Sequence, residues 1–198
     1  EEPPNENGCM KISVITINRN NVAGLKKTLA SVIAQTHNDV EFIVIDGAST
    51  DGSVDAIKTH IEHISQWISE PDTGIYNAMN KGIARATGDY LIFMNAGDSF
   101  ADNNSITQFV NSYFQETIVF GNQIRLYPDG RTDLWQVNGQ TIDFSFFARR
   151  GIPHQSTFIQ RTVFEKYGSY REDLPIYADW ELVARSVLVH GETIRHVP

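Results

Sequence analysis

The chain of 198 residues contains one cysteine, Cys9, so no disulfide can form within it. Such low cysteine usage fits a reducing compartment such as the cytoplasm. The six histidines show no zinc-like spacing, and Cys9 has no second cysteine to join it in a zinc site. No apolar run approaches the roughly 18 residues of a membrane span. We therefore expect neither a disulfide scaffold, nor a structural zinc site, nor a membrane-spanning helix.

Positive charge is also scarce. The chain has 16 lysines and arginines against 24 acidic residues, which gives a net charge of -8. A general nucleic-acid binder needs a basic footprint, so no nucleic-acid partner is expected. A nucleotide ligand remains compatible with this charge, because a divalent cation can supply the missing positive charge.

The start of the chain, EEPPNENG, has no apolar core of a signal peptide. We interpret residues 1–10 as a flexible or cloning-derived lead-in. The last residue, Pro198, follows an expected strand closely, which suggests a truncated piece of a longer protein. Residues 11–198 have the length of one ordinary domain.

Strands alternate with helices in the first half of the chain. β-branched and apolar runs predict strands at 11–17, 40–46, 67–69 and 90–94. Helical spacing of apolar residues predicts helices at 22–33, 53–64 and 75–86. We expect Asp51 or Ser53 to cap the second helix, and Asp72 or Thr73 the third. This alternation with short connections is the βαβ pattern of a parallel, doubly wound sheet.

The pattern changes after Asp98. The turn Pro128-Asp129-Gly130 separates expected strands at 123–127 and 132–137, which form an antiparallel hairpin. Further strands are expected at 117–120 and 155–160, and helices at 104–114, 141–148, 161–167 and 179–190. The fold class is therefore α/β, with a central, mostly parallel sheet flanked by helices and a hairpin in the C-terminal half.

Three carboxylates follow the ends of expected strands: Asp46, Asp72 and Asp98. Open α/β sheets bind ligands at this edge. Asp98 follows Gly97, where the backbone permits close approach, and a single carboxylate suits Mg²⁺ or Mn²⁺ bound largely through a phosphate ligand. A turn or helix cap remains the alternative for each of these acids.

Further candidates lie in the second half. Asp179 opens the last helix and is either a helix cap or a general base. His154 and Gln155 follow a proline and could line a pocket. Arg149 and Arg150 form a basic pair that could meet a phosphate or lie on a solvated surface.

Four motifs occur in order. They are SVITIN at 13–18, FIVIDGASTDGS at 42–53, NAMNKGI at 77–83 with ATGDY at 86–90, and FMNAGD at 93–98. Together they resemble the family 2 glycosyltransferases with the GT-A fold, within which the chain looks similar to bacterial enzymes of polysaccharide biosynthesis. The resemblance covers residues 11 to 190.

The resemblance implies a Rossmann-like GT-A domain, with a nucleotide-sugar donor half at 11–98 and an acceptor half at 99–198. It implies that the nucleotide contacts Thr16, Asn18, Asp46 and Ser49, with Asp51 and Asp72 as further candidates. Lys81 would lie near the donor pocket. The family's metal motif is usually Asp-x-Asp, whereas Asn95 stands here for the first acid, so Asp98 remains as the metal ligand. Asp179 matches the family's catalytic base, and Glu181 is its alternative.

The implied activity is a metal-dependent, inverting transfer of a sugar from a UDP-sugar to a hydroxyl group. The implied acceptor is a glycan or a lipid-linked oligosaccharide, which would place a cytoplasmic enzyme at the inner face of a bacterial membrane. Two other classes remain open. A non-catalytic nucleotide-sugar-binding domain would tolerate the altered metal motif. A sugar nucleotidyltransferase would need a glycine-rich phosphate loop, but residues 18–21 read Asn-Arg-Asn-Asn.

Overall fold

The computed structural model describes residues 10–112, 115–137 and 139–198. Cys9 and the expected lead-in, apart from its last residue, lie outside the described residues, as does the end of the helix expected at 104–114. Within the described ranges, no helix is both long and apolar enough to cross a membrane.

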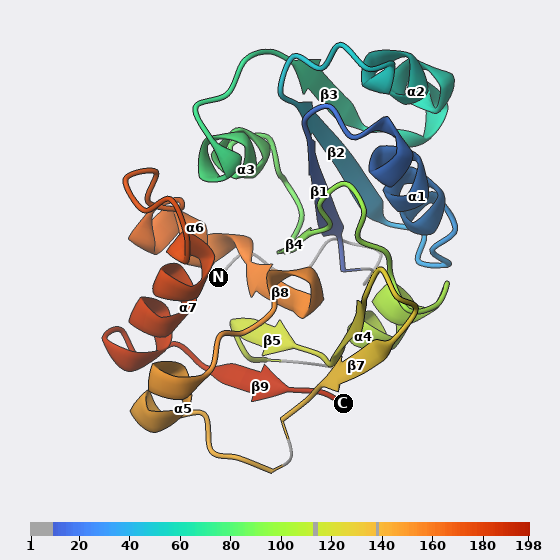
Figure 1. Cartoon of the computed structure of the whole chain (residues 1–198). Coiled ribbons are helices and arrows are strands. Elements are labelled where there is room, and N and C mark those ends of the chain that lie inside the picture. The colour runs from blue at the N-terminus through green and yellow to red at the C-terminus, as the bar shows by residue number, and fades with distance from the viewer. Residues whose placement is uncertain (1–9, 113–114, 138) are drawn as a thin grey trace.

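The first half of the chain folds as strands alternating with helices, as expected (Figure 1). Its elements are β1 (Ile12–Asn18), α1 (Val22–Ile33), β2 (Val40–Asp46), α2 (Ser53–Thr59), a 3-10 turn (Ile61–His63), β3 (Gln66–Ser69), α3 (Ile75–Ile83) and β4 (Tyr90–Phe93). The helix expected at 53–64 therefore ends early and continues as the 3-10 turn.

The second half contains shorter elements. They are α4 (Ser105–Asn111), β5 (Ile118–Phe120), β6 (Gln123–Leu126), β7 (Thr132–Trp135), α5 (Phe144–Arg149), a 3-10 turn (His154–Ser156), β8 (Thr157–Gln160), α6 (Arg161–Tyr167), α7 (Ala178–Leu188) and β9 (Ile194–His196). The strand expected at 155–160 begins only at Thr157, because the preceding residues form the 3-10 turn.

Seven strands form one sheet in the order β3-β2-β1-β4-β8-β5-β9, and β6 and β7 form a separate antiparallel hairpin. Strands β1 to β4 are parallel to one another. The sheet departs from the parallel pattern at β8, which runs antiparallel to both β4 and β5. The expectation of a mostly parallel sheet with a C-terminal hairpin is thus confirmed.

Helices cover both faces of the sheet (Figure 1). Side chains alternate along β1, so that Ile12 and Val14 pack with α1, α2 and α4, whereas Ile15 packs with α3 and α7. Strand β2 alternates in the same way. The two-residue period of a strand thus distributes its apolar side chains between two cores. On α3, Tyr76 is buried and Ile75 is 45% exposed, so the first apolar residue of the segment predicted as a helix at 75–86 does not face the core.

The starts of α2 and α3 differ from expectation. Helix α2 has Gly52 as its N-cap with no capping side chain, so neither Asp51 nor Ser53 is its N-cap. Helix α3 has Gly74 as its N-cap with no capping side chain, so neither Asp72 nor Thr73 caps it. Asp72 Oδ1 instead accepts from Gly74 N at 3.2 Å. The Asp51 carboxylate contacts the first residues of two helices, because Oδ1 accepts from Ser53 N on α2 and Oδ2 accepts from Val22 N on α1.

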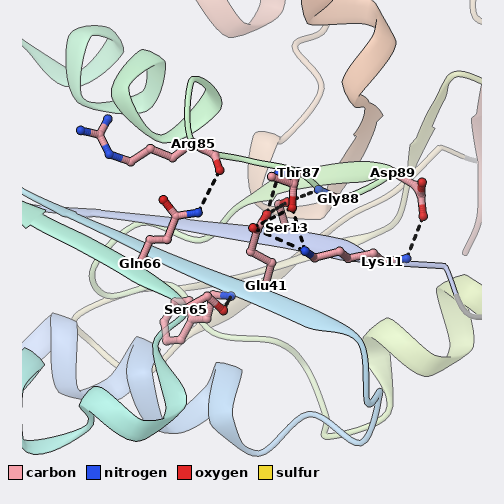
Figure 2. Close-up of polar contacts among 10 residues, drawn as sticks. Lys11, Ser13, Glu41, Ser65, Gln66, Arg85, Thr87, Gly88 and Asp89 are labelled. Carbon is pink, nitrogen blue, oxygen red and sulfur yellow. Dashed lines mark hydrogen bonds and ion pairs between the residues drawn. The ribbon is translucent and has the colours of Figure 1, made fainter. Parts of the chain in front are cut away.

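The amino ends of the strands are fixed by a buried carboxylate (Figure 2). Glu41 accepts from Ser13 Oγ (2.6 Å), Thr87 N (2.7 Å) and Thr87 Oγ1 (2.8 Å). Burial raises the pKa of Glu41, but these hydrogen bonds outweigh burial and hold that pKa below its ordinary value. The ATGDY segment therefore anchors β4 at the end of the sheet opposite to the carboxylates after β2 and β4.

Candidate active site

Asp46 lies at the carboxyl end of β2, opposite Asn18 in the β1–β2 register. Its side chain is fully buried and accepts four hydrogen bonds. The donors are Asn18 Nδ2 (2.8 Å), Ser49 N (2.9 Å), Ser49 Oγ (2.6 Å) and Ser69 Oγ (2.7 Å). Burial raises the pKa of Asp46, but the hydrogen bonds outweigh it, so the pKa lies below its ordinary value. Asp46 therefore joins the ends of β1, β2 and β3 at the edge of the sheet where the nucleotide is expected.

The other residues expected to contact the nucleotide lie around Asp46. Thr16 is buried and donates from Oγ1 to Met94 O at 2.8 Å, which ties β1 to β4. Ser49 Oγ also accepts from Asn20 N at 2.8 Å. Asn18 Oδ1 is buried and has no hydrogen-bond partner among the described residues. This oxygen is an acceptor that a bound ligand could satisfy.

Asp72 and Lys81 shape the segment before α3. Asp72 lies against Gly47, where an added Cβ would collide with Oδ2, and its Oδ1 is 3.6 Å from Arg19 Nη1. Lys81 Nζ lies 2.9 Å from Glu70 Oε1 and donates to Pro71 O at 2.8 Å. Lys81 thus holds the loop that carries Asp72, and its ammonium group already has two protein partners.

The loop after β4 contains Asn95 and Asp98. Thr28 Oγ1 on α1 holds this loop: it donates to Asp98 O at 2.8 Å, lies 3.1 Å from Asn95 O and accepts from Gly97 N at 3.0 Å. Burial raises the pKa of Asp98, although a hydrogen bond from Asn95 N opposes this effect. In the part of the chain that the structure describes, no lysine, arginine or histidine forms an ion pair with Asp98. Asp98 is therefore a half-buried carboxylate: burial raises its pKa, and the charges of His154 and Lys27 partly offset this rise without forming an ion pair with it.

Such a carboxylate fits a divalent cation with oxygen ligands. The described residues contain no cluster of three or more histidine, cysteine or acidic side chains that could hold a metal alone. A cation at Asp98 would therefore need further ligands from a bound phosphate or from water. The single-carboxylate metal site at Asp98 therefore stays a prediction.

Asp179 lies in the first turn of α7, where the free backbone N–H groups favour a negative charge. It is not the N-cap, a position that Tyr177 occupies. Asp179 Oδ1 accepts from Tyr76 Oη at 2.8 Å, and Oδ2 lies 3.1 Å from His154 Nδ1. Burial raises the pKa of Asp179, but the hydrogen bonds from His154 and Tyr76 outweigh burial and lower it. Asp179 is thus ionised at neutral pH, as the general base expected from the sequence has to be. Glu181, its alternative, instead pairs with Arg185 at 2.7 Å.

His154 connects the two halves of the site. Its Nε2 lies 3.1 Å from Asn95 Nδ2, and its Nδ1 faces Asp179. The reversal of β8 causes this proximity, because the start of an antiparallel strand lies beside the end of its neighbour, β4. Sequence analysis placed His154 in a pocket without assigning a partner, and it missed Tyr76. The proline before His154 does not indicate which residues, far away in the sequence, the His154 ring contacts.

Arg149 and Arg150 do not join this group. Arg149 donates to Ser145 O at 3.0 Å, and the Arg150 guanidinium lies over the Trp135 ring at 5.1 Å. Both residues line a surface hollow beside α5, together with Gln140, Thr141 and Asp143. No contact of Arg149 or Arg150 with Asp98 or Asp179 is found within the described ranges.

The comparison with protein families identifies the chain. The model of glycosyl transferase family 2 matches residues 13–168. The chain belongs to glycosyltransferase family 2. An uncharacterized glycosyltransferase of Mycobacterium tuberculosis is 38% identical over 188 residues, which cover 90% of this chain and 69% of that protein. The PGL/p-HBAD biosynthesis glycosyltransferase of Mycobacterium bovis is 29% identical over 180 residues, which cover 87% of this chain and 68% of that protein.

Solved structures of low sequence identity share the GT-A fold of this family 2 member. The mannosyltransferase of Pyrobaculum calidifontis, in complex with GDP-Man and Mn²⁺, aligns with a TM-score of 0.73 at 18% identity. S. aureus TarS 1-349, in complex with UDP, aligns with a TM-score of 0.71 at 16% identity. The chain covers 55% and 58% of those two structures, so it spans little more than half of their length.

Proposed function

We propose that this family 2 chain carries the catalytic site of an inverting glycosyltransferase that uses a UDP-sugar donor. One observation carries the proposal: Asn95 and His154 join the loop of Asp98 to the carboxylate of Asp179 through contacts of 3.1 Å. A carboxylate suited to a metal–diphosphate and a carboxylate suited to a proton therefore lie on one continuous network. A simple binding domain does not require this second carboxylate, and a nucleotidyltransferase would need a glycine-rich loop where residues 18–21 read Asn-Arg-Asn-Asn.

The chemistry follows from these residues. The acceptor hydroxyl oxygen forms a bond to the anomeric carbon as the bond from that carbon to the diphosphate oxygen breaks. The hydroxyl proton passes to Asp179, which acts as general base. Attack comes from the face opposite the diphosphate, so the anomeric configuration inverts. When bound at Asp98, Mg²⁺ or Mn²⁺ would supply positive charge beside the leaving diphosphate.

The protein's own groups prepare this step. Tyr76 and His154 orient the Asp179 carboxylate, and Thr28 fixes the loop that carries Asp98. Asn18 Oδ1 offers an unsatisfied acceptor beside the end of β1. As acceptor we propose a glycan or a lipid-linked oligosaccharide, which would bring the protein to the inner face of a bacterial membrane.

A direct assay tests the proposal. Calorimetry with UDP, GDP and their sugar conjugates, with and without Mn²⁺, identifies the donor base, and donor turnover is then measured with and without candidate acceptors. We expect a UDP-sugar to bind and turn over, and Asp179→Asn to lower turnover about 100-fold or more while donor binding persists. Near-wild-type turnover of Asp179→Asn would remove that residue as the base.

Metal dependence is tested separately. We expect dialysis against EDTA to abolish turnover, and Mn²⁺ or Mg²⁺ to restore it. Unchanged UDP binding and turnover after EDTA would contradict the metal role of Asp98. Binding without turnover under every condition would favour the alternative that Asn95 keeps open, a non-catalytic nucleotide-sugar-binding domain.

A further inference from the structure

His154 lies between two groups that impose different demands on its ring. The side chain is 21% exposed and belongs to the 3-10 turn that precedes β8. On one side the Asn95 amide nitrogen is 3.1 Å from Nε2, and on the other the Asp179 carboxylate is 3.1 Å from Nδ1. An amide nitrogen can only donate, and a carboxylate can only accept.

One neutral form of the ring suits both facing atoms, while Asn95 Oδ1 stays buried without a hydrogen-bond partner among the described residues. Nε2 accepts from Asn95, so the single ring proton lies on Nδ1 and is donated to Asp179. The hydrogen bond made by one ring nitrogen thereby decides the state of the other. We infer that His154 is a positioning residue that fixes the Asp179 carboxylate, and that Asn95 selects the ring tautomer needed for this role.

This inference accounts for the amide at position 95. A carboxylate there would accept rather than donate, so Nε2 would need a proton of its own. The bond from Nδ1 to Asp179 would then survive only on a doubly protonated ring. Asn95 thus links the donor loop to Asp179 and leaves that carboxylate with a neutral partner. The link rests on the proposed function only in taking Asp179 as the proton acceptor.

The tautomer is measured without turnover. Long-range ¹H–¹⁵N correlation spectra of protein labelled with ¹⁵N-histidine distinguish a proton on Nδ1 from one on Nε2. His154→Asn identifies the His154 signals among those of the six histidines by their loss. We expect a neutral ring with the proton on Nδ1 at neutral pH, and loss of this preference in Asn95→Ala. A proton on Nε2, alone or on a doubly protonated ring, would overturn the inference.

Kinetics test the positioning role with two variants. His154→Asn retains an N–H close to the place of Nδ1, whereas His154→Leu retains volume without a donor. We expect His154→Leu to lower kcat about 10- to 100-fold with little change in the donor KM, and His154→Asn to recover most of this loss. Equal losses in both variants, or a rise in donor KM at unchanged kcat, would contradict positioning.

A matched control, His196→Asn, and the activity of Asp179→Asn show which assumption fails if the His154 variants behave unexpectedly. His196 on β9 also has an asparagine partner, at 2.8 Å from Asn122 Oδ1, and we expect His196→Asn to retain wild-type kcat. Thermal unfolding identifies any variant that has lost its fold. If Asp179→Asn is inactive while His154→Leu is fully active, this inference alone fails. If Asp179→Asn is active, the assignment of the base fails, whatever the ring spectra show.

Discussion

Tyr76 donates a 2.8 Å hydrogen bond to Asp179 although 103 positions separate the two residues. Tyr76 lies on α3, in the half of the chain expected to bind the donor (the donor half), and Asp179 lies on α7, in the expected acceptor half. Burial, followed by the neighbouring Asp179 carboxylate, raises the pKa of Tyr76 to about 12, so the phenol remains protonated and can donate. The donor half therefore directly holds the group that we propose as the base.

Replacing Tyr76, which donates a hydrogen bond to Asp179, should change the pH dependence of turnover. The hydrogen bonds from His154 and Tyr76 lower the pKa of Asp179 by favouring its charged form. Tyr76→Phe removes one of them, so the pKa should rise and the acid limb of kcat should move to higher pH. The measurement is the pH profile of kcat at saturating donor, with His196→Asn as the control. An acid limb that moves to lower pH would show that Tyr76 does not stabilise the ionised base.

Asp98→Asn should stabilise the metal-free protein while abolishing transfer. Burial raises the pKa of Asp98, so its charged form costs more free energy in the folded state than in the unfolded chain. Its contribution to stability is fully present below the ordinary pKa of Asp and is lost as pH rises through the raised value. At neutral pH the variant removes this penalty, and each 1 kcal/mol gained should raise Tm by roughly 2–4 °C.

The measurement is thermal unfolding in EDTA and then with UDP and Mn²⁺. We expect Mn²⁺ with UDP to raise the Tm of the wild type and to have a much smaller effect on Asp98→Asn. A lower Tm for the variant in EDTA would mean that the protein already compensates the Asp98 charge.

Asp46→Asn should weaken the fold as well as any donor site. The two carboxylate oxygens of Asp46 accept four hydrogen bonds. In Asp46→Asn an amide nitrogen, which cannot accept, replaces one of these oxygens, so some of the donors lose their partner. We expect the free energy of unfolding to fall by about 2 kcal/mol, measured by urea denaturation. Asp55→Asn removes a charge from an exposed position on α2 and serves as the control. Equal stability of both variants would indicate that Asp46 has no anchoring role.

Gly88→Ala should destabilise the end of the sheet that lies opposite the site. An added Cβ would lie 2.6 Å from Ser13 N and 2.9 Å from Lys11 O, which are backbone atoms that cannot move independently (Figure 2). We expect a cost of about 1–3 kcal/mol in unfolding free energy. Gly121→Ala is the matched control, because its Cβ would meet nothing nearer than 3.6 Å. If the two variants lose equal stability, the steric argument is wrong.

Sequence patterns predicted the elements that depend on local periodicity. The apolar runs of β1, β2 and β4 and the turn between β6 and β7 lie close to their expected positions. Asp98 and Asp179 also lie where the strand and helix patterns place them. These features depend on neighbours within a few residues, which a sequence displays directly.

The contacts that build the site depend on residues far apart. The contact between Asn95 and His154 spans 59 positions, and it exists because β8 reverses against β4. A short apolar run carries no signal for its direction in a sheet. Likewise, no pattern could show that Ser69 would complete the partners of Asp46. The positions of the acids were predictable, whereas the contacts by which other side chains orient them were not.

The reversal at β8 also bears on how such chains could diversify. Donor contacts are expected on β1, β2 and the loop after β4, whereas the proposed base Asp179 and its neighbour His154 belong to α7 and to the turn before β8. The two sets meet along the boundary between β4 and β8. Exchanging the segment from α5 to α7 between relatives could therefore redirect the enzyme to a new acceptor while the sugar donor stays the same.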